Sequence, residues 1–275
     1  MRCRRAARIT LHLVVVAAFF IAPLAPRAAT AADLDCLIQP HEMVAVSSAV
    51  EGLVEKITVD RGDLVEQGAV LVALESSAER AAVAVAKARA EVASAIKSSE
   101  VRVEFGVRRF VRTEEMFKKD LVPIKEMDEA ETGKVLAELG LLEAQENQRL
   151  AELEYERAKA ALALRTIRSP ITGVVVERLR SVGEATGQSP LVKLAQIDPL
   201  RVEVFAPVAL LGSIKLGMQG VVTPESPLNT TSHTARVSVV DRVVDAASGT
   251  FGVRLELPNR GYRLPAGLKC KVRFK

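Results

Sequence analysis

Hydrophobic and polar positions follow one rhythm near both ends of the chain and another in the middle. Residues 36–76 and 166–275 contain short runs in which apolar and polar residues alternate, separated by Gly, Pro, Asn and Ser. Alternation with a period of two is typical of half-buried β-strands. Residues 77–165 are rich in Ala, Glu, Lys, Arg and Leu and contain one proline, which favours helix. The pattern predicts a helical segment inserted between two β-forming segments.

Two stretches of the β-forming segments repeat each other. The runs beginning at Gly52 and Gly173 read "GLVEKITVDRGD" and "GVVVERLRSVGE", and they align without gaps at an offset of 121 residues. The same offset matches Gly62 with Gly183, and we expect all four glycines at positions that need a positive φ or a close backbone approach. Each copy is predicted to form a two-stranded hairpin. Because two strands alone are marginal in water, the copies are expected to pack face to face as one small sandwich.

Apolar residues between the two copies recur at coiled-coil spacing with a phase shift. The predicted seam consists of Val85, Val92, Ile96, Val103, Phe110 and Phe117 on the first side, and of Val135, Leu139, Leu142, Leu150, Leu153 and Leu164 on the second. Ser76 and Glu79 have capping-box spacing, and Pro123 suits the first turn of a new helix. We therefore expect two antiparallel helices of about 40 residues, each roughly 60 Å long, with a tip near residues 118–125.

The expected fold is mixed α and β and elongated. The two copies form sandwich halves over residues 50–76 and 166–197, and the helical hairpin covers residues 77–165. Residues 33–49 and 198–275 carry the remaining alternating runs, which predict a small antiparallel β-barrel domain.

Residues 1–32 have the pattern of a secretory signal peptide. Four arginines precede the short apolar run "LHLVVVAAFFIA", and small residues lead to Ala31. The alternative is an uncut membrane anchor, although the run is shorter than the ~20 residues that span a bilayer. Cleavage would remove five arginines and no acid, so the formal net charge would fall from +4 to −1. The basic balance of the whole chain therefore gives no support to nucleic-acid binding.

Two cysteines would remain after cleavage, Cys36 and Cys270. In an oxidising exported compartment an even pair favours a disulfide, which would tie the first strand to the last. The alternative is two unrelated buried thiols.

No catalytic, cofactor-binding or metal-binding pattern stands out, so we do not expect an enzyme. The predicted hairpin tip is the more promising surface, because Arg112, Met116 and Lys119 cluster there. They favour a docking surface for another helical hairpin, although an ordinary solvated helix end would have the same pattern.

These features together resemble the periplasmic adaptor (membrane fusion protein) family, the HlyD-like and RND-efflux adaptors of Gram-negative bacteria. The specific part is the pair of lipoyl-like (biotinyl/lipoyl) half-motifs, "VEGLVEKITVDRGDLVEQGAVLVALES" and "IRSPITGVVVERLRSVGEATG", and the likeness extends over residues 36–275. The resemblance implies a non-catalytic periplasmic subunit of a tripartite efflux or secretion system. Such a subunit assembles into a ring and bridges an inner-membrane transporter to a TolC-like outer-membrane channel.

The sequence departs from the family pattern at the tip and at its end. Family tips often carry an Arg, a Leu four residues later and a Ser seven further on, and Arg112, Met116 and Pro123 stand at those positions. Pro123 removes the hydroxyl and puts the identity of the channel in doubt. Many RND-linked adaptors also continue into a membrane-proximal domain, whereas this sequence ends at Lys275. An RND-type transporter is favoured over an ABC-type one, and the barrel is expected to contact it.

Two other functions remain open. A lipoyl- or biotin-type carrier subunit of an enzyme would need a modifiable lysine in the turn between the half-motifs, where Glu75, Ser76 and Ser77 lead into the helix. A stand-alone periplasmic coiled-coil protein would not need the repeated half-motifs.

Overall fold

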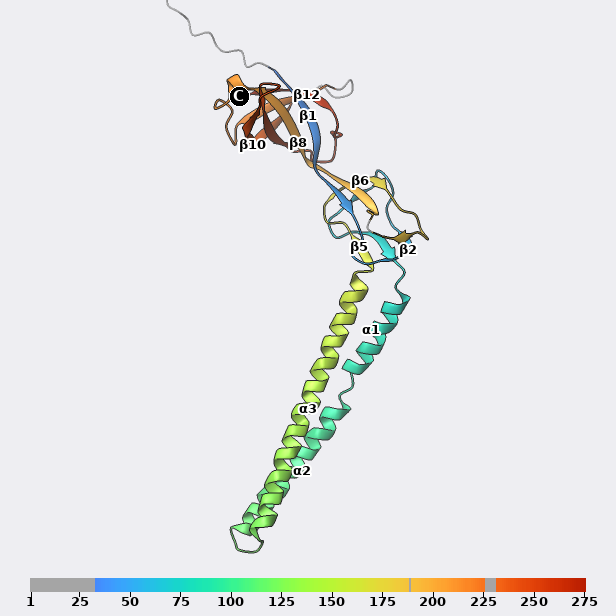
Figure 1. The fold of residues 1–275 in the computed structure, drawn as a ribbon, viewed down its shortest axis with the longest axis vertical. Coiled ribbons are helices and arrows are strands. Elements are labelled where there is room, and N and C mark those ends of the chain that lie inside the picture. Colours follow the sequence, from blue (N-terminus) through green and yellow to red (C-terminus); the bar gives the residue numbers. More distant parts are fainter. Residues whose placement is uncertain (1–32, 188, 226–230) are drawn as a thin grey trace, which may run out of the picture. The chain divides into compact units, whose positions relative to one another are not determined.

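The computed structural model describes residues 33–187, 189–225 and 231–275 (Figure 1). The predicted signal peptide, residues 1–32, lies outside the described residues. The strands are β1 (Leu34–Val46), β2 (Gly52–Ile57), β3 (Leu64–Val65), β4 (Val70–Leu74), β5 (Thr166–Arg168), β6 (Gly173–Arg178), β7 (Ala185–Thr186), β8 (Val192–Pro207), β9 (Gln219–Pro224), β10 (His233–Asp245), β11 (Thr250–Leu257) and β12 (Lys269–Phe274). The helices are α1 (Ser77–Ala90), α2 (Ser94–Phe117) and α3 (Ile124–Ala163), with a 3₁₀ turn at Val208–Leu210.

Six antiparallel strands form the barrel, in the order β1, β12, β9, β10, β11 and β8, and the pairing of β1 with β8 closes it. Its buried core is aliphatic apart from Phe251 and the two cysteines, Cys36 and Cys270, and Ile38, Val202 and Leu255 are fully buried. These residues alternate with outward-facing polar residues along their strands, which is the periodicity that the sequence displays.

The two sequence copies form a sandwich, but they exchange strands instead of packing as two separate hairpins face to face. Each copy does contain a paired couple of strands, β2 with β4 and β6 with β8. However, β2 also pairs with β7 of the other copy, and β6 pairs with β3 of the other copy. Both sheets therefore contain strands from both copies, and they enclose a core around Leu71, Leu74 and Leu194.

Strands β1 and β8 belong to both β-structures. Ile38 of β1 is buried in the barrel core, whereas Val46 of the same strand is buried in the sandwich core. The pairing of β1 with β8 shifts register between Pro40 and Glu42, and a bulge of this kind re-aims the side chains beyond it. The expected boundary at residue 49 therefore lies too late, because Val44 and Val46 already pack in the sandwich.

The helical insert, residues 77–163, consists of one continuous helix and an antiparallel partner that is divided in two. Helix α3 is 40 residues long, so it extends about 60 Å. One partner helix of equal length was expected, but the structure has two shorter helices, α1 and α2, in its place. They are separated at residues 91–93, and both contact α3 (Figure 1). The amide side chain of Gln148 on α3 donates to the carbonyl oxygen of Ala90 at this break.

The seam of the insert differs from the one that the apolar pattern predicts. Ile96, Val103 and Phe110 are half-buried as expected, but the six large residues expected on the second side are exposed, as are Val85, Val92 and Phe117. The covered side of α3 has the same 3–4 spacing, but there alanines alternate with larger residues: Met127, Ala130, Lys134, Ala137, Leu141, Ala144, Gln148, Ala151, Tyr155, Ala158 and Leu162.

Close approach of the helices explains this choice of face. Gly106 of α2 is buried so tightly that a Cβ atom there would lie 3.3 Å from the Lys134 Cα and 3.6 Å from the Ala137 Cβ. Backbones this close leave no room for a leucine opposite Gly106, so the face that has an alanine at every second position turns inward. The prediction is wrong because it ranked faces by hydrophobicity alone.

The predicted capping box is also wrong. Ser76 occupies the N-cap position of α1, but its side chain makes no capping hydrogen bond. Its hydroxyl oxygen accepts instead from the Arg80 guanidinium, at 2.9 Å. Glu79, which would complete the box, forms an ion pair with Arg165. The two side chains that would form the capping box are therefore bound to arginines instead of to backbone amides.

Candidate docking surfaces

The interrupted repeat gives the sandwich an internal pseudo-two-fold relation. Gly52 pairs with Thr186, and Gly173 pairs with Val65. The two pairs are equivalent under the offset of 121 residues, because Gly52 corresponds to Gly173 and Val65 corresponds to Thr186. The strands that meet across the sandwich therefore repeat the same register twice.

The backbone hydrogen bonds at the two turns repeat in the same way. The amide of Val54 donates to the carbonyl oxygen of Glu184, and the amide of Val175 donates to that of Asp63, both at 2.9 Å. Because each turn is anchored on the other copy, neither half can complete its hydrogen bonds alone. The two halves must therefore come together across the helical insert.

The four repeated glycines divide into two kinds. Gly62 and Gly183 have φ angles of +94° and +88°, a region that favours glycine. Gly52 and Gly173 instead lie where another part of the chain comes close. A Cβ atom on Gly173 would overlap the carbonyl oxygen of Ala195 and lie 2.9 Å from its carbonyl carbon. The repeat thus places a turn glycine and a contact glycine at the same positions in each copy.

An ion pair fixes the helical insert to the sandwich. Arg165, just after α3, donates to Glu79 of α1 at 2.5 Å and to the carbonyl oxygen of Glu51 at 2.9 Å. Its side chain is 22% exposed, so this contact is largely shielded from water. Residues 75–77, where a carrier domain would present a lysine, here lead directly into α1.

Glu75 supports the first turn of α1. The Ser77 side chain and backbone both hydrogen-bond to its carboxylate, and these bonds lower the pKa of Glu75 below its ordinary value. The amide of Ser77 lies 2.7 Å from Glu75 Oε1. Ionised Glu75 thus accepts from the amide of the first residue of α1, which has no partner within the helix.

The tip of the insert is a compact, ordered turn. The amide of Leu121 donates to the carbonyl oxygen of Met116, and the amide of Asp120 donates to that of Phe117. Asp120 has a φ of +57°. These bonds form a Schellman motif in which Asp120 occupies the left-handed position that glycine usually takes. Pro123 then occupies the N-cap position of α3.

All four residues predicted for the tip surface are exposed: Arg112, Met116, Lys119 and Pro123. The turn brings Met116 and Lys119 together, since the amide of Lys119 donates to the Met116 carbonyl oxygen at 3.1 Å. Arg112 lies one turn earlier on α2, and Pro123 lies on the other side of the turn.

The tip also exposes two apolar residues that the sequence pattern does not predict. Leu121 is 66% exposed and Ile124 is 65% exposed, and Phe117 is partly exposed beside them. They flank Pro123, and their signal in the sequence is an apolar residue on each side of a helix-starting proline. The tip is therefore an apolar surface bordered by cations, which suits a protein partner.

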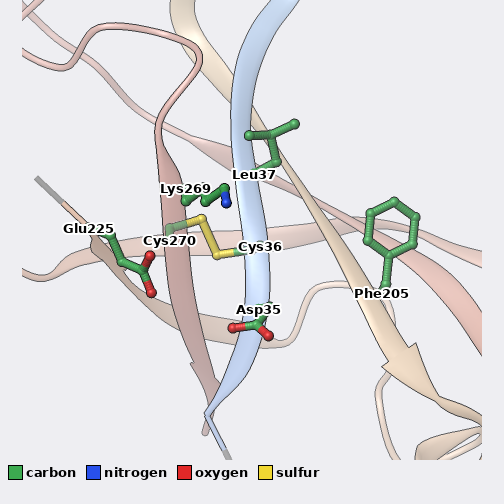
Figure 2. A pocket seen from close by; sticks show the side chains of 7 residues that line it. All are labelled: Asp35, Cys36, Leu37, Phe205, Glu225, Lys269 and Cys270. Atoms are coloured by element: carbon green, nitrogen blue, oxygen red, sulfur yellow. A yellow bond between two sulfur atoms is a disulfide. The ribbon is translucent and has the colours of Figure 1, made fainter.

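The barrel carries the disulfide and a hollow beside it. Cys36 and Cys270 face each other on β1 and β12 and are bonded, with an S–S distance of 2.07 Å. Figure 2 shows the hollow, which has a volume of about 400 Å³. Its lining includes the two cysteines, Asp35, Glu225 and Phe205, and the Phe205 side chain is 66% exposed. Such a hollow can accept an apolar side chain of another protein.

Within the described ranges, no group of three or more His, Cys, Asp or Glu side chains could hold a metal ion. No helix in that part of the chain is both long enough and apolar enough to cross a membrane.

Comparison with solved structures shows a shared fold. MacA from Actinobacillus actinomycetemcomitans has a TM-score of 0.73 and 20% sequence identity, covering 89% of this chain and 78% of that one. The membrane fusion protein Spr0693 from Streptococcus pneumoniae R6 has a TM-score of 0.61 and 17% identity, covering 89% and 98%. A putative efflux transporter from Bacteroides eggerthii DSM 20697 has a TM-score of 0.56 and 17% identity, covering 88% and 68%.

Comparison with curated protein sequences finds no match. The sequence profile of the CzcB-like barrel-sandwich hybrid domain, however, matches residues 42–195, which is more than half of the chain. This range begins where β1 enters the sandwich and ends within β8, so it contains both half-motifs and the insert between them. The chain belongs to the CzcB-like barrel-sandwich hybrid family of periplasmic adaptor, or membrane fusion, proteins.

Proposed function

We propose that this protein is the periplasmic adaptor subunit of a tripartite efflux or secretion system. In this role it bridges an inner-membrane transporter to a TolC-like outer-membrane channel and acts by assembly, without catalysis. The observation that carries the proposal is the split sandwich: its two halves complete each other's turns, and the carrier turn is replaced by a 40-residue helix and its partners.

The helical insert would act as a coiled-coil hairpin that reaches the channel. Its tip supplies an apolar surface at Leu121 and Ile124, with Arg112 and Lys119 as neighbouring cations. Apolar anchors bordered by charged groups are the usual composition of a protein–protein contact. Pro123 stands where many family members carry a serine, so the channel would accept a tip without that hydroxyl.

The barrel would contact the transporter, for which an RND-type protein is favoured over an ABC-type one. The exposed Phe205 beside the disulfide offers an apolar anchor for that contact. Several copies would assemble as a ring around the exported substrate. The disulfide fits an exported, oxidising compartment, as expected for the periplasm.

The test is photo-crosslinking in cells with a photoreactive residue at Leu121, at Phe205 or, as a control, at Leu153. Leu153 is 58% exposed but far from the tip on α3. We expect an outer-membrane channel at position 121 and an inner-membrane transporter at position 205, and the class of that transporter decides between RND and ABC. Capture of neither protein would refute the bridging role.

A further inference from the structure

The exposed apolar residues of the barrel are gathered in two segments. Among the described residues from 199 to 275, the exposed Val, Leu, Ile, Met and Phe residues are Phe205, Val208, Leu211, Leu216, Val239 and Val243. They lie within residues 205–216 and 239–243 and leave the rest of the barrel wall without large exposed apolar side chains. Clustering of this kind marks a surface that binds a protein or a membrane.

Residues 208–218 form a cap over the end of the barrel at which β8 ends. The residues of the cap that pack against the barrel core are Leu210, Ile214 and Met218. Val208, Leu211 and Leu216 are instead 48%, 49% and 69% exposed. The cap therefore covers the core with one set of apolar residues and presents a second set to its surroundings.

Val243 is presented by an irregularity in β10. Residues 241–243 lie opposite a single residue of β11, Gly252. The Asp241 carboxylate fills the space that a side chain on Gly252 would occupy. The acid is thus turned onto the barrel wall, whereas Val243 is 81% exposed. A bulge of this kind re-aims side chains that a regular strand would pair.

Hydrogen bonds attach the cap to the hairpin that β10 and β11 form. The amide of Val208 donates to the carbonyl oxygen of Gly249 in the hairpin turn, at 3.0 Å. The amide of Gly217 donates to the carbonyl oxygen of Val237 in β10, at 2.9 Å. Both ends of the cap are therefore held on this hairpin. The exposed residues of the cap and the bulge are together called the apolar end: Val208, Leu211, Leu216 and Val243.

Polar groups beside the apolar end are bonded within their own turns. The Ser213 hydroxyl donates to the carbonyl oxygen of Leu210, at 2.6 Å. The Asp245 carboxylate accepts from the amide of Ala247, at 2.9 Å, and from the hydroxyl of Ser248, at 3.0 Å. Turns with satisfied polar groups can leave water without the cost of unpaired N–H and O–H groups.

The charges near the apolar end favour a shallow contact. The hydrogen bonds from Ala247 and Ser248 lower the pKa of Asp245, so this residue stays ionised and belongs at the level of polar headgroups. Lys215 immediately precedes Leu216, and Arg242 immediately precedes Val243. The ion pairs in the described part of the barrel are formed by other side chains. Both cations therefore remain available to lipid phosphates while the apolar neighbours enter the interface.

We propose that the apolar end of the barrel rests on a phospholipid bilayer. Leu216 and Val243 enter the interfacial region, and Lys215 and Arg242 bind lipid phosphates. A bilayer accepts side chains that project singly from a cap and a bulge, whereas a protein partner would need a matching pocket for each of them. The inference rests on the proposed function in one respect: a barrel that contacts an inner-membrane transporter stands beside the periplasmic leaflet around it.

Vesicle binding by the purified chain without its predicted signal peptide tests the contact. The vesicles contain equal parts of phosphatidylethanolamine and phosphatidylglycerol, and sedimentation measures the bound fraction. Leu216→Ser combined with Val243→Ser should weaken binding at least about tenfold, because the buried apolar area is lost. The matched control is Leu136→Ser combined with Leu153→Ser, which removes two residues of α3 that are 63% and 58% exposed. The control should bind as the natural chain does, and circular dichroism checks the folding of both variants.

A fluorophore that responds to polarity tests which residues enter the bilayer. Cys36 and Cys270 are bonded to each other, so a single introduced cysteine can be labelled selectively. Labels at Leu216→Cys and Val243→Cys should shift to shorter wavelength when vesicles are added, and a label at Leu153→Cys should not. Unshifted labels at 216 and 243 would contradict the proposed contact.

Charge reversal tests the role of the two cations. Lys215→Glu combined with Arg242→Glu should weaken binding to vesicles that contain phosphatidylglycerol roughly fivefold, and added salt should weaken binding of the natural chain. Both effects should be smaller on vesicles of phosphatidylcholine alone. Equal effects on the two kinds of vesicle would contradict phosphate binding by Lys215 and Arg242.

Failure of the natural chain to bind vesicles, or an equal loss in the control pair, would overturn the proposal. Photo-crosslinking of position 216 to a protein, without vesicle binding, would assign the apolar end to a protein partner instead. The vesicle measurements use the chain alone. Absence of lipid binding with intact crosslinks at positions 121 and 205 would therefore leave the proposed function standing, whereas lipid binding without those crosslinks would refute the bridging role and leave the membrane contact.

Discussion

The barrel buries its large apolar residues, whereas the helical insert leaves many of its own exposed. In the barrel, Val202, Leu255 and their neighbours are fully buried. In the insert, the buried residues among those described are only Ser99, Gly106 and Ala130, while leucines on α3 remain about half exposed. The barrel is therefore stabilised from within, whereas the insert leaves much of its apolar surface available to other proteins.

The largest expected difference in stability is between truncating a buried leucine and truncating an exposed one. Leu255→Ala should lower the free energy of unfolding by about 2–5 kcal/mol, because it leaves a cavity in the barrel core. Leu153→Ala should change it by no more than about 0.5 kcal/mol. Urea unfolding of the two variants measures both values, and a similar loss in both would contradict the contrast between the regions.

The next effect concerns the close approach within the sandwich. Gly173→Ala places a methyl group against the Ala195 carbonyl and should cost roughly 1–3 kcal/mol of stability. Gly187→Ala is the matched control, because no atom lies within 4 Å of a Cβ there. Thermal unfolding of both variants is the measurement. An unchanged midpoint for Gly173→Ala would show that the two halves do not pack this tightly.

Within the insert, two glycines should respond with opposite signs. Gly106→Val forces α2 away from the Lys134 backbone and should destabilise the helix pair by about 1–3 kcal/mol. Gly140→Ala adds a methyl group in open space and should stabilise α3 by roughly 0.5–1 kcal/mol. Helical circular dichroism during heating reports both. Stabilisation by Gly106→Val would mean that the seam lies on another face.

The smallest effect is a pH dependence at the first turn of α1. Since the folded-state pKa of Glu75 is lowered, its stabilising contribution is complete above the ordinary glutamate pKa and is lost as the pH falls through the lowered value. Glu75→Gln should therefore weaken the turn slightly at neutral pH and have no effect in strong acid. Chemical-shift titration of the Glu75 carboxyl measures the pKa. A value at or above that of an unfolded peptide would contradict the hydrogen bonding to Ser77.

Periodicity allowed much of the fold to be predicted. The offset of 121 residues between Gly52 and Gly173 identified the two sandwich halves, and the change of period at Ser76 identified the helical insert. The spacing of Ile96, Val103 and Phe110 identified the covered face of α2. These features follow from local geometry, because strands and helices repeat every 2.0 and 3.6 residues whatever they pack against.

The tip was only partly predictable. The position of the turn and the family pattern point to Arg112, Met116, Lys119 and Pro123. The sequence does not predict the exposure of Leu121 and Ile124, since an apolar residue in a short connection does not indicate by itself whether it is buried. The conformation of Asp120, which shapes the turn, is a property of the hydrogen bonds around it.

The sequence by itself determined where strands and helices occur, which segments are copies of each other and which chain positions can form each turn. Only the tertiary structure decided which face of α3 turns inward, where the first helical side divides and how the two copies exchange strands. The physical reason is that a periodic pattern defines the faces of an element but not its neighbours. Gly106 and the alanines of α3 allow two backbones to approach closely, and that approach is a property of both helices together.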